Sequence, residues 1–348
     1  MTRERPNARG RVAISRTVSW RSSLREVPPL LLSYLTIAGA ALALTLGASW
    51  AFARWFAKPK RRLPATRPNG ASEQVRFFSS GVPLEGWYLE PSTRGAPHPA
   101  VGLVHGWSAN AAQMMPLAAQ VRDSGFGALL FHARGHGTSG CDGPVTIASF
   151  AQDARAALRY LAGRSDVDAS RLALVGHSIG GGAAILVAAE AAAPCLRAVV
   201  SSSAFAHPRE VTRRSLRRLR LPVWPTLPLV TRIIESWLGA SLGDVAPETR
   251  IHEVRLPLLL IHGGEDRFVP LDDLEALWSR ANQTLAERWL APGRRHGDIL
   301  ADPEYGKRVV TFLRRHLGTT ESASCTAPLV EEGGNSGPGG RGAGWPLP

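Results

Sequence analysis

The sequence predicts an α/β protein with a mostly parallel central sheet and helices on both of its faces. Short apolar strand patterns alternate with helical patterns from residue 99 to residue 317, which is typical of parallel strands joined by helices. A chain of 348 residues that is 44% hydrophobic is long enough to bury a single core of this kind. A long uncharged segment near the N-terminus lies outside the alternation and predicts a separate element.

This N-terminal element is an uncharged stretch from Leu30 to Ala53 that is long enough to cross a bilayer as a helix. Arginines flank it on both sides and aromatic residues lie at its C-terminal end, as is typical of membrane segments. A buried core helix and a cleaved signal sequence are the alternatives, because Ala51-Phe52-Ala53 resembles a cleavage site. The apolar stretch is longer than the usual core of a signal peptide. We therefore predict one uncleaved transmembrane anchor over residues 28–53.

The net charge of +13 is confined to a few segments. Residues 1–27 carry +5, residues 54–67 carry +6 and residues 205–221 carry +5, so the rest of the chain carries about −3. Basic residues beside a membrane segment are expected, and this distribution gives no support to nucleic-acid binding. The charges on the two sides of the anchor nearly cancel. Because a short basic tail usually stays in the cytoplasm, we expect the folded domain on the extracytoplasmic side.

The core begins with a predicted antiparallel hairpin, formed by Gln74 to Phe78 and Leu84 to Leu89 around a Ser-Gly turn. Further helices are predicted over Ile147 to Ala162 and Pro303 to Leu317. The predicted organisation is a basic tail (1–27), the anchor (28–53), a basic linker (54–72), a core (73–204 and 251–318), an insertion that caps the site (205–250) and a disordered Gly/Pro-rich tail (319–348).

The pentapeptide Gly176-His177-Ser178-Ile179-Gly180 lies between a predicted strand and a predicted alanine-rich helix. A Gly-x-Ser-x-Gly turn in this position can hold a serine in a strained conformation, with its hydroxyl exposed at the end of the sheet. The N–H of Ile179, at the helix start, can then face a developing oxyanion. The alternative is an ordinary strand-to-helix turn that a glycine-rich chain contains by chance.

Four other segments follow predicted strands. The strand at residues 99–104 ends in His105-Gly106-Trp107, and the strand at 128–131 precedes His132-Ala133-Arg134-Gly135-His136-Gly137-Thr138-Ser139. Later strands precede a loop containing Asp266 and a loop containing His296. The chain order is therefore serine, acid, histidine. This is one of the known orders for the three residues of a catalytic triad.

With the Gly-x-Ser-x-Gly turn, these segments resemble the alpha/beta-hydrolase superfamily. The resemblance implies an alpha/beta-hydrolase fold, with Ser178 as nucleophile, His296 as general base and Asp266 as the residue that orients the histidine. It also implies that the N–H groups of Trp107 and Ile179 form the oxyanion hole. The sequence departs from the family pattern at His132, where an aspartate is usual. For His132, a metal ligand is an alternative, but no ligand cluster accompanies it.

Two other carboxylates lie close to the predicted triad. Glu265 is adjacent to Asp266, and Asp298 is two residues from His296. Some relatives place the acid after the sixth strand, but that position here reads Ser201-Ser202-Ser203. We expect Glu265 to point elsewhere and Asp298 to lie too near in sequence to reach the far ring nitrogen, so Asp266 is the predicted acid.

The insertion at 205–250 contains an apolar helical stripe that includes Trp237, preceded by a stretch rich in arginine. In a protein tethered to a bilayer, such a stretch could form a lid that rests on anionic headgroups. The alternative is a solvated basic face on an ordinary cap. The arginines concerned are Arg213, Arg214, Arg217, Arg218 and Arg220.

These features predict a membrane-anchored serine hydrolase that cleaves an ester, lipid ester or thioester through an acyl-enzyme. No cofactor and no metal are implied. The chain is most similar to the Bem46-type and the monoglyceride-lipase or serine-aminopeptidase-like branch of the superfamily. A peptidase or acyltransferase of the same fold is an alternative, because fold does not fix the reaction. A non-catalytic, membrane-tethered binding scaffold is a further alternative.

Overall fold

The computed structural model describes residues 29–65, 67–68, 72–93, 95, 97–190 and 195–318. The predicted tails at 1–27 and 319–348 lie outside the described residues. The chain divides into two compact units, residues 1–46 and residues 47–348, which are described separately below.

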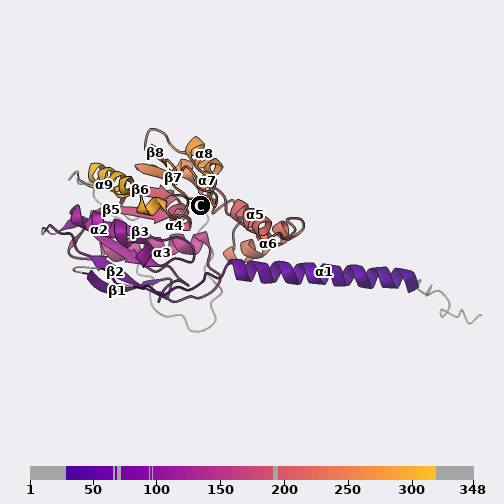
Figure 1. Ribbon diagram of the computed structural model, residues 1–348. Coiled ribbons are helices and arrows are strands. Elements are labelled where there is room, and N and C mark those ends of the chain that lie inside the picture. The colour runs from indigo at the N-terminus through magenta and orange to yellow at the C-terminus, as the bar shows by residue number, and fades with distance from the viewer. Residues whose placement is uncertain are drawn as a thin grey trace, which may run out of the picture. The chain divides into compact units, whose positions relative to one another are not determined.

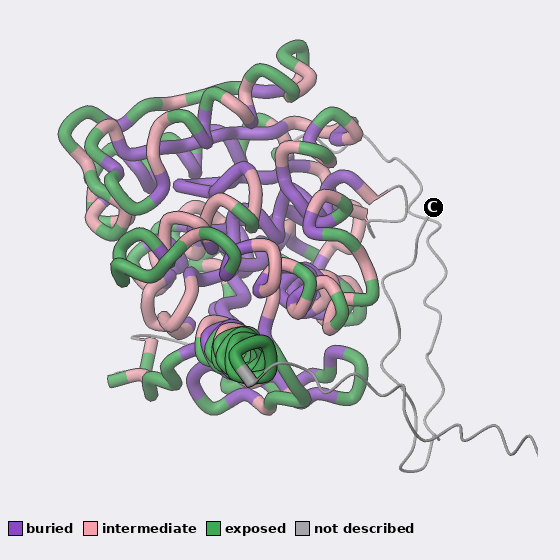
Figure 2. The backbone as a smooth tube through the Cα atoms, turned by 90° about the vertical axis from the view of Figure 1, so that its right-hand side faces the viewer, coloured by how far each residue is buried: buried purple, intermediate pink, exposed green. Residues whose placement is uncertain are grey.

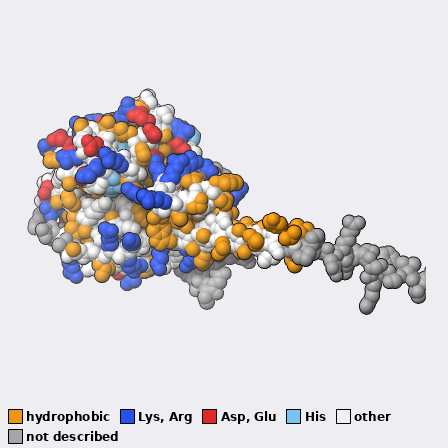
Figure 3. All heavy atoms as spheres, turned by 45° about the vertical axis from the view of Figure 1, so that its right-hand side comes forward, with side chains coloured by type: hydrophobic (Ala, Val, Ile, Leu, Met, Phe, Trp, Pro, Cys, Tyr) orange, Lys and Arg blue, Asp and Glu red, His pale blue; other side chains and the backbone are white. Residues whose placement is uncertain are grey.

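The first unit contains most of helix α1, which begins at Pro29 and ends at Phe56. From Leu30 to Phe56 the helix is long and apolar enough to cross a membrane, with a mean hydropathy of 1.9. Its leucine side chains are exposed, Leu44 by 75%, and hydrophobic atoms cover the helix surface (Figure 3). These properties fit a membrane anchor and a signal sequence equally well.

The last turns of α1 belong to the second unit, where they are packed into the folded core. Phe52 and Ala53 are buried in the main hydrophobic cluster, and the Phe52 ring stacks on that of Phe56. Just beyond the helix, the N–H of Val145 donates to the carbonyl of Ala57 at 2.9 Å. The helix ends three residues later than the predicted anchor, and the first part of the predicted linker is integrated into the fold.

Among the described residues of the second unit, eight strands form one sheet in the order β1-β2-β4-β3-β5-β6-β7-β8 (Figure 1). The pairs β1–β2 and β2–β4 are antiparallel, and every other neighbouring pair is parallel. The predicted opening hairpin and parallel sheet are therefore confirmed. The strands are β1 (Ser72–Ser79), β2 (Val82–Leu89), β3 (His98–Val104), β4 (Gly127–Phe131), β5 (Val167–His177), β6 (Leu196–Ser202), β7 (Leu258–Gly263) and β8 (Ala286–Ala291).

Helices cover both faces of the sheet because its central strands are apolar on both sides. Along β5, Leu172 and Leu174 belong to one hydrophobic cluster and Ala173 and Val175 to the other, as expected for side chains that alternate between faces. In Figure 2 the buried residues, in purple, lie mainly in the interior of the second unit, and the exposed residues, in green, lie mainly at its outside. The first cluster includes helices α3 (Ile147–Ala162), α4 (Ile179–Ala188) and α8 (Leu271–Arg280), and the second includes α2 (Met115–Asp123) and α9 (Pro303–Leu317).

The chain between β6 and β7 includes residues 205–250, which the sequence analysis assigned to an insertion. It contains α5 (Pro208–Arg218), α6 (Thr226–Leu238), α7 (Pro247–Arg250) and the short 3-10 helix η2 (Ile251–Glu253). Two other 3-10 helices are η1 (Ala111–Met114) and η3 (Ile299–Ala301). The helical residues between β3 and β4 are divided into η1 and α2, because Pro116 at the start of α2 begins a new helix.

Candidate active site

Ser178 lies in the sharp turn between β5 and α4, with φ of 57° and ψ of −121°. This conformation is strained for a residue with a side chain, and the N–H of Ser178 holds it by donating to the carbonyl of Ser202 at 2.8 Å. A Cβ atom at Gly176 would clash with the backbone of Gly180, and one at Gly180 would clash with the backbone of Val104. Both glycines are therefore required by close backbone approach, as the motif predicts.

Three distant segments bring a serine, a histidine and an aspartate together. The Nε2 atom of His296 lies 3.0 Å from Ser178 Oγ, and its Nδ1 atom lies 2.7 Å from Asp266 Oδ2. Ser178 follows β5, Asp266 follows β7 and His296 follows β8, so the ends of three strands supply the groups. This arrangement can pass the hydroxyl proton of a serine to an imidazole that a carboxylate orients.

The environment of Asp266 favours its ionised form. Its side chain is fully buried, and its Oδ1 atom accepts hydrogen bonds from the N–H groups of Phe268 at 2.9 Å and Val269 at 2.8 Å. Burial alone would raise the pKa of Asp266, but the hydrogen bond and charge of His296 and these two N–H groups outweigh it and lower the pKa. A buried carboxylate is thus held negative beside His296.

The two competing carboxylates are bound elsewhere or exposed. Asp298 Oδ1 accepts the N–H of Arg295, and its Oδ2 atom lies 3.4 Å from the guanidinium of Arg295. Glu265 is exposed, and its N–H donates to the carbonyl of Arg294. Of the three acids considered from the sequence, the structure places only Asp266 against His296.

Two rings pack against the imidazole of His296. His177 lies on one side with its ring centroid at 5.0 Å, and Phe268 lies at 4.9 Å. Burial, together with the nearby His296, lowers the pKa of His177 to about 3. A neutral His177 therefore packs beside His296 without adding a second positive charge.

The loop that contains Trp107 is fixed on both sides of that residue. The N–H of Gly106 donates to Gln113 Oε1 at 2.8 Å, and the N–H of Ser108 donates to His136 Nε2 at 3.1 Å. Within the part of the chain that the structure describes, the N–H groups of Trp107 and Ile179 have no hydrogen-bond acceptor. These are the two groups that the sequence analysis assigned to an oxyanion hole, and both are available to a ligand.

Three fully buried histidines, His105, His132 and His136, support this loop and are called the buried histidine set below. Each accepts a backbone N–H on one ring nitrogen: Ala133 donates to His105, Ala111 to His132 and Ser108 to His136.

The buried histidine set is neutral, because a ring nitrogen that accepts an N–H carries no proton. Burial lowers the pKa of His132 and of His136 to about 4. His105 also contacts the carbonyl of Gly106 through Nδ1, so it joins its own loop to the loop after β4. Sequence reasoning missed the hydrogen-bonding roles of His132 and His136. Their spacing in the loop after a strand end was the available signal. His132 occupies the position where the family usually has an aspartate. Here it is a neutral ring that accepts the N–H of Ala111.

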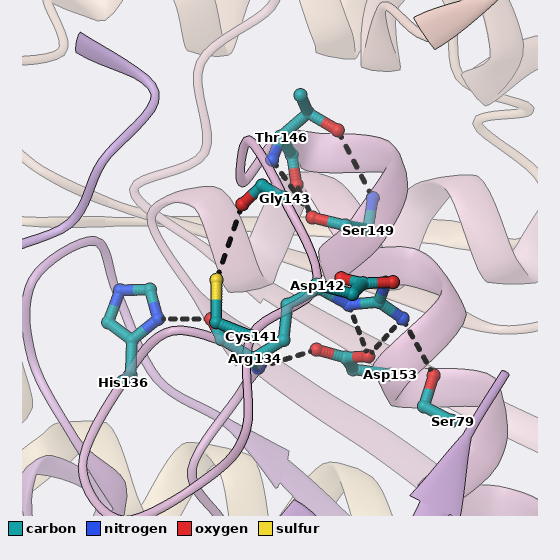
Figure 4. A network of polar contacts seen from close by, with 9 residues as sticks. All are labelled: Ser79, Arg134, His136, Cys141, Asp142, Gly143, Thr146, Ser149 and Asp153. Carbon is teal, nitrogen blue, oxygen red and sulfur yellow. Dashed lines mark hydrogen bonds and ion pairs between the residues drawn. The ribbon is translucent and has the colours of Figure 1, made fainter. Parts of the chain in front are cut away.

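The loop after β4 is anchored by a buried ion pair (Figure 4). The guanidinium of Arg134 contacts Asp153 Oδ1 at 2.8 Å and also binds Ser79 and, at 3.2 Å, Asp142. The N–H of Arg134 donates to the other oxygen of Asp153 at 2.7 Å. Because the carbonyl of Arg134 accepts from His136 Nδ1, this pair holds the histidine that fixes Ser108.

A pocket of about 520 Å³ opens above Ser178, within the usual range for small-molecule sites. Its walls come from the end of α1, the Trp107 loop, the insertion and the loop after β7. The buried lining is mostly apolar and includes Val145, Ile147, Ile179, Phe205, Ile234 and Leu242.

Comparison with known proteins places this site in a family. A family model described as serine aminopeptidase, S33, matches residues 95–246. The uncharacterized protein Rv2307c of Mycobacterium tuberculosis is 33% identical over 261 residues, which cover 74% of this chain and 81% of that protein. The uncharacterized protein YfhR of Escherichia coli K12 is 28% identical over 254 residues, covering 70% of this chain and 81% of the relative. The chain belongs to the alpha/beta-hydrolase superfamily, in its serine-aminopeptidase-like branch.

Solved structures share the fold at low sequence identity. The esterase Pf2001 of Pyrococcus furiosus gives a TM-score of 0.60 at 21% identity and covers 75% of this chain and 98% of its own. An acetyl xylan esterase from Paenibacillus sp. R4 gives 0.58 at 20% identity, covering 79% and 94%. A proline iminopeptidase from Mycobacterium smegmatis gives 0.54 at 16% identity, covering 70% and 98%. The fold of esterases and of a peptidase is thus shared, and the family supports a hydrolase.

Proposed function

We propose that this protein is a serine hydrolase that cleaves a carboxylic ester or thioester through an acyl-enzyme. The observation that carries the proposal is the contact of His296 with both Ser178 and Asp266, at 3.0 and 2.7 Å. In the first step Ser178 Oγ attacks the acyl carbon while its proton passes to His296 Nε2, and the N–H groups of Trp107 and Ile179 stabilise the oxyanion. His296 then returns the proton to the leaving group as its bond to the acyl carbon breaks.

In the second step a water attacks the acyl-enzyme and gives its proton to His296. The bond between the acyl carbon and Ser178 Oγ then breaks, the serine regains its proton, and a carboxylic acid leaves. Asp266 stays ionised throughout and orients the imidazole. No step needs a cofactor.

The apolar lining of the pocket supports an acyl substrate over a polar peptide. A peptidase or an acyltransferase is the second candidate within the fold, and the shared fold of the iminopeptidase favours the former. We also propose that the protein is of the Bem46 type or of the monoglyceride-lipase type, which are narrower groups within the superfamily. The non-catalytic scaffold is the alternative of a different class.

Labelling with a fluorophosphonate probe tests the proposal, because an activated serine is trapped whatever its natural substrate. We expect the full-length protein in detergent to be labelled and the Ser178→Ala variant to remain unlabelled. Ser203→Ala is the matched control, since Ser203 is buried in a strained conformation near the site but has no histidine partner. A folded wild-type protein that is not labelled would replace this proposal with the scaffold.

We also propose that α1 is an uncleaved single-pass membrane anchor and that residues 205–250 cap the site. Cleavage after Ala53 would remove Phe52 from the main hydrophobic cluster, which supports retention of the helix. Lining of the pocket by Phe205, Thr212 and Ile234 supports the cap.

The arginine-rich stretch of the cap has partners inside the protein. Arg213 pairs with Glu210 and Arg214 with Asp273, while Arg217 and Arg218 line the pocket. These contacts support a cap whose basic residues stabilise the fold and line the pocket. They give less support to a lid that binds the headgroups of the membrane.

The mass of the purified protein and its behaviour in membranes test the anchor. An uncleaved anchor predicts the intact mass and retention in membranes after carbonate extraction at alkaline pH. A protein shortened by its first 53 residues, or extracted by carbonate, would contradict the anchor.

External protease on intact cells tests on which side of the membrane the folded domain lies. The extracytoplasmic placement predicts that a C-terminal tag is cut and an N-terminal tag is protected.

A further inference from the structure

The pocket above Ser178 is lined by positive charge without compensating negative charge. Among the residues that the structure describes, no aspartate or glutamate lines it. Basic side chains reach it from three segments far apart in sequence: the chain after α1, helix α5 and the loop after β7. They are Lys58, Lys60, Arg214, Arg217, Arg218 and Arg267.

Most of these cations are not used by the fold. Arg214 pairs with Asp273 at 2.5 Å, and the guanidinium of Arg218 lies 5.7 Å from the centre of the Phe268 ring. The charged side chains of the other four form no ion pair or hydrogen bond with any residue in the described ranges. These residues are called the basic rim below: Lys58, Lys60, Arg217 and Arg267.

The basic rim marks the opening of the pocket. All four of its residues are exposed although they line the cavity, whereas the apolar lining residues Ile179, Phe205 and Ile234 are buried. Polarity therefore changes along the pocket, from an apolar wall beside Ser178 to a solvent edge where these cations lie among the exposed Trp55, Leu219 and Phe268. A molecule that fits this gradient has an apolar chain at one end and an anionic group at the other.

We infer that the substrate is an anionic amphiphile: an acyl ester or thioester whose leaving group carries a phosphate-like anion. This inference rests on the proposed function of Ser178. The acyl chain lies among the apolar residues, the acyl carbon at Ser178, and the anionic group against the basic rim. Lysine and arginine both bind phosphate oxygens, and a guanidinium can do so through two N–H groups.

The anionic group can come from a lipid headgroup or from a soluble phosphorylated carrier, and the shared chemistry is the same. Trp55 and Phe56, in the last turn of the proposed anchor, also line the pocket. The lipid source therefore agrees with the anchor, and the soluble thioester is the second arm of the test.

The test compares leaving groups that differ in charge but carry the same acyl chain. We would measure kcat/KM for 1-octanoylglycerol 3-phosphate, neutral 1-octanoylglycerol and octanoyl-coenzyme A, using the full-length protein in non-ionic detergent. We expect the phosphate ester to be preferred over the neutral ester about tenfold or more, because several weak, exposed charge contacts add up. The preference should shrink as salt is raised from about 0.05 M to about 0.5 M. A preference for octanoyl-coenzyme A over the phosphate ester would assign the anion to a soluble carrier.

Two variants with the same change in net charge separate the rim from general electrostatics. Lys60→Gln/Arg217→Gln/Arg267→Gln removes three rim charges, and we expect the ratio of the two kcat/KM values to fall about tenfold. The control, Arg209→Gln/Arg220→Gln/Arg232→Gln, removes three exposed arginines of the cap region that do not line the pocket, and it should keep the wild-type ratio.

The outcomes distinguish failure of this inference from failure of the proposed function. A protein labelled by fluorophosphonate that hydrolyses both glycerol esters equally, or whose rim variant keeps the wild-type ratio, would overturn the anionic substrate alone. If the labelled protein cleaves neither ester, a competition experiment replaces the kinetics. Octyl phosphate and neutral 1-O-octylglycerol are each added before the fluorophosphonate probe, and we compare how well each protects Ser178 from the probe. Equal protection would overturn the inference, and stronger protection by the phosphate would support it. A folded protein without labelling would instead remove the proposed function.

Discussion

Two regions of this molecule are built around histidine and use it in opposite ways. His296 at the candidate site has a carboxylate on one ring nitrogen and a serine hydroxyl on the other, and its side chain is 21% exposed. The buried histidine set of His105, His132 and His136 lies beneath the neighbouring loop, and each ring accepts a backbone N–H.

The difference lies in the charge state that each environment favours. A buried imidazole with neutral backbone partners is held uncharged, because the charged form would lose hydration without gaining a counter-ion. An imidazole against ionised Asp266 gains stabilisation when it takes a proton. The residue type is therefore a poor guide to chemistry, and the partner on the second ring nitrogen decides between a proton carrier and a structural support.

The largest expected effect comes from removing the charge of that partner. Asp266→Asn keeps the size of the side chain but offers His296 no carboxylate, so the imidazolium formed during attack loses its counter-ion. We expect kcat/KM for a p-nitrophenyl ester to fall by about 10⁴-fold. Steady-state kinetics of the purified variant would measure the loss.

Asp298→Asn and Glu265→Gln are the matched controls for this change. Asp298 binds Arg295 and Glu265 is exposed, so neither variant should lower kcat/KM by more than about threefold. A loss in Asp298→Asn as large as that in Asp266→Asn would show that the acid has been assigned wrongly.

A smaller effect is expected from the support beneath the oxyanion loop. His136→Phe keeps an aromatic ring beside Trp107 but removes the acceptor for the N–H of Ser108. Loss of a direct oxyanion donor costs about 10²-fold to 10³-fold in kcat, and this change only loosens the loop that presents Trp107. We therefore expect kcat to fall about tenfold with little change in KM.

His136→Gln separates positioning from general damage, because its side-chain oxygen can accept the same N–H. Recovery of most of the wild-type kcat is expected in this variant. If both variants lose stability to the same extent but neither loses kcat, His136 supports only the fold.

The sequence predicted the parts of the site that follow from local rules. Gly176 and Gly180 are needed by the turn itself, and Asp266 and His296 follow strands whose ends meet at one edge of a parallel sheet. The opening hairpin was predictable for the same reason, because a short Ser-Gly turn joins its two strands.

The buried histidine set and the basic rim were not predicted, because each depends on contacts between distant segments. Ala111 N–H reaches His132 across 21 residues, and Lys60 and Arg267 line one pocket although they are distant in sequence. The end of α1 at Phe56 was also missed, since Phe52 and Ala53 read as apolar anchor residues until the core that buries them is known.

The last expected effect concerns stability in acid and tests the uncharged state of the buried histidine set. His132 has a pKa of about 4 in the folded protein and about 6.5 when unfolded, so the unfolded chain binds more protons between these values. The free energy of unfolding is therefore highest above pH 6.5 and falls as the pH drops toward 4. His132 alone accounts for up to about 3 kcal/mol of this loss. The lowered pKa of Asp266 changes the free energy of unfolding only below pH 4, which is outside this window.

His132→Asn should remove this part of the acid sensitivity, because the amide oxygen can accept the N–H of Ala111 at any pH in the window. Urea unfolding at pH 7 and pH 4.5, followed by circular dichroism, should show a smaller loss of unfolding free energy than in the wild type, by about 2 kcal/mol. His252→Asn, at an exposed histidine, should leave the loss unchanged. If His132→Asn keeps the wild-type acid sensitivity, His132 is not held neutral by burial, and the contrast between His132 and His296 fails at this position.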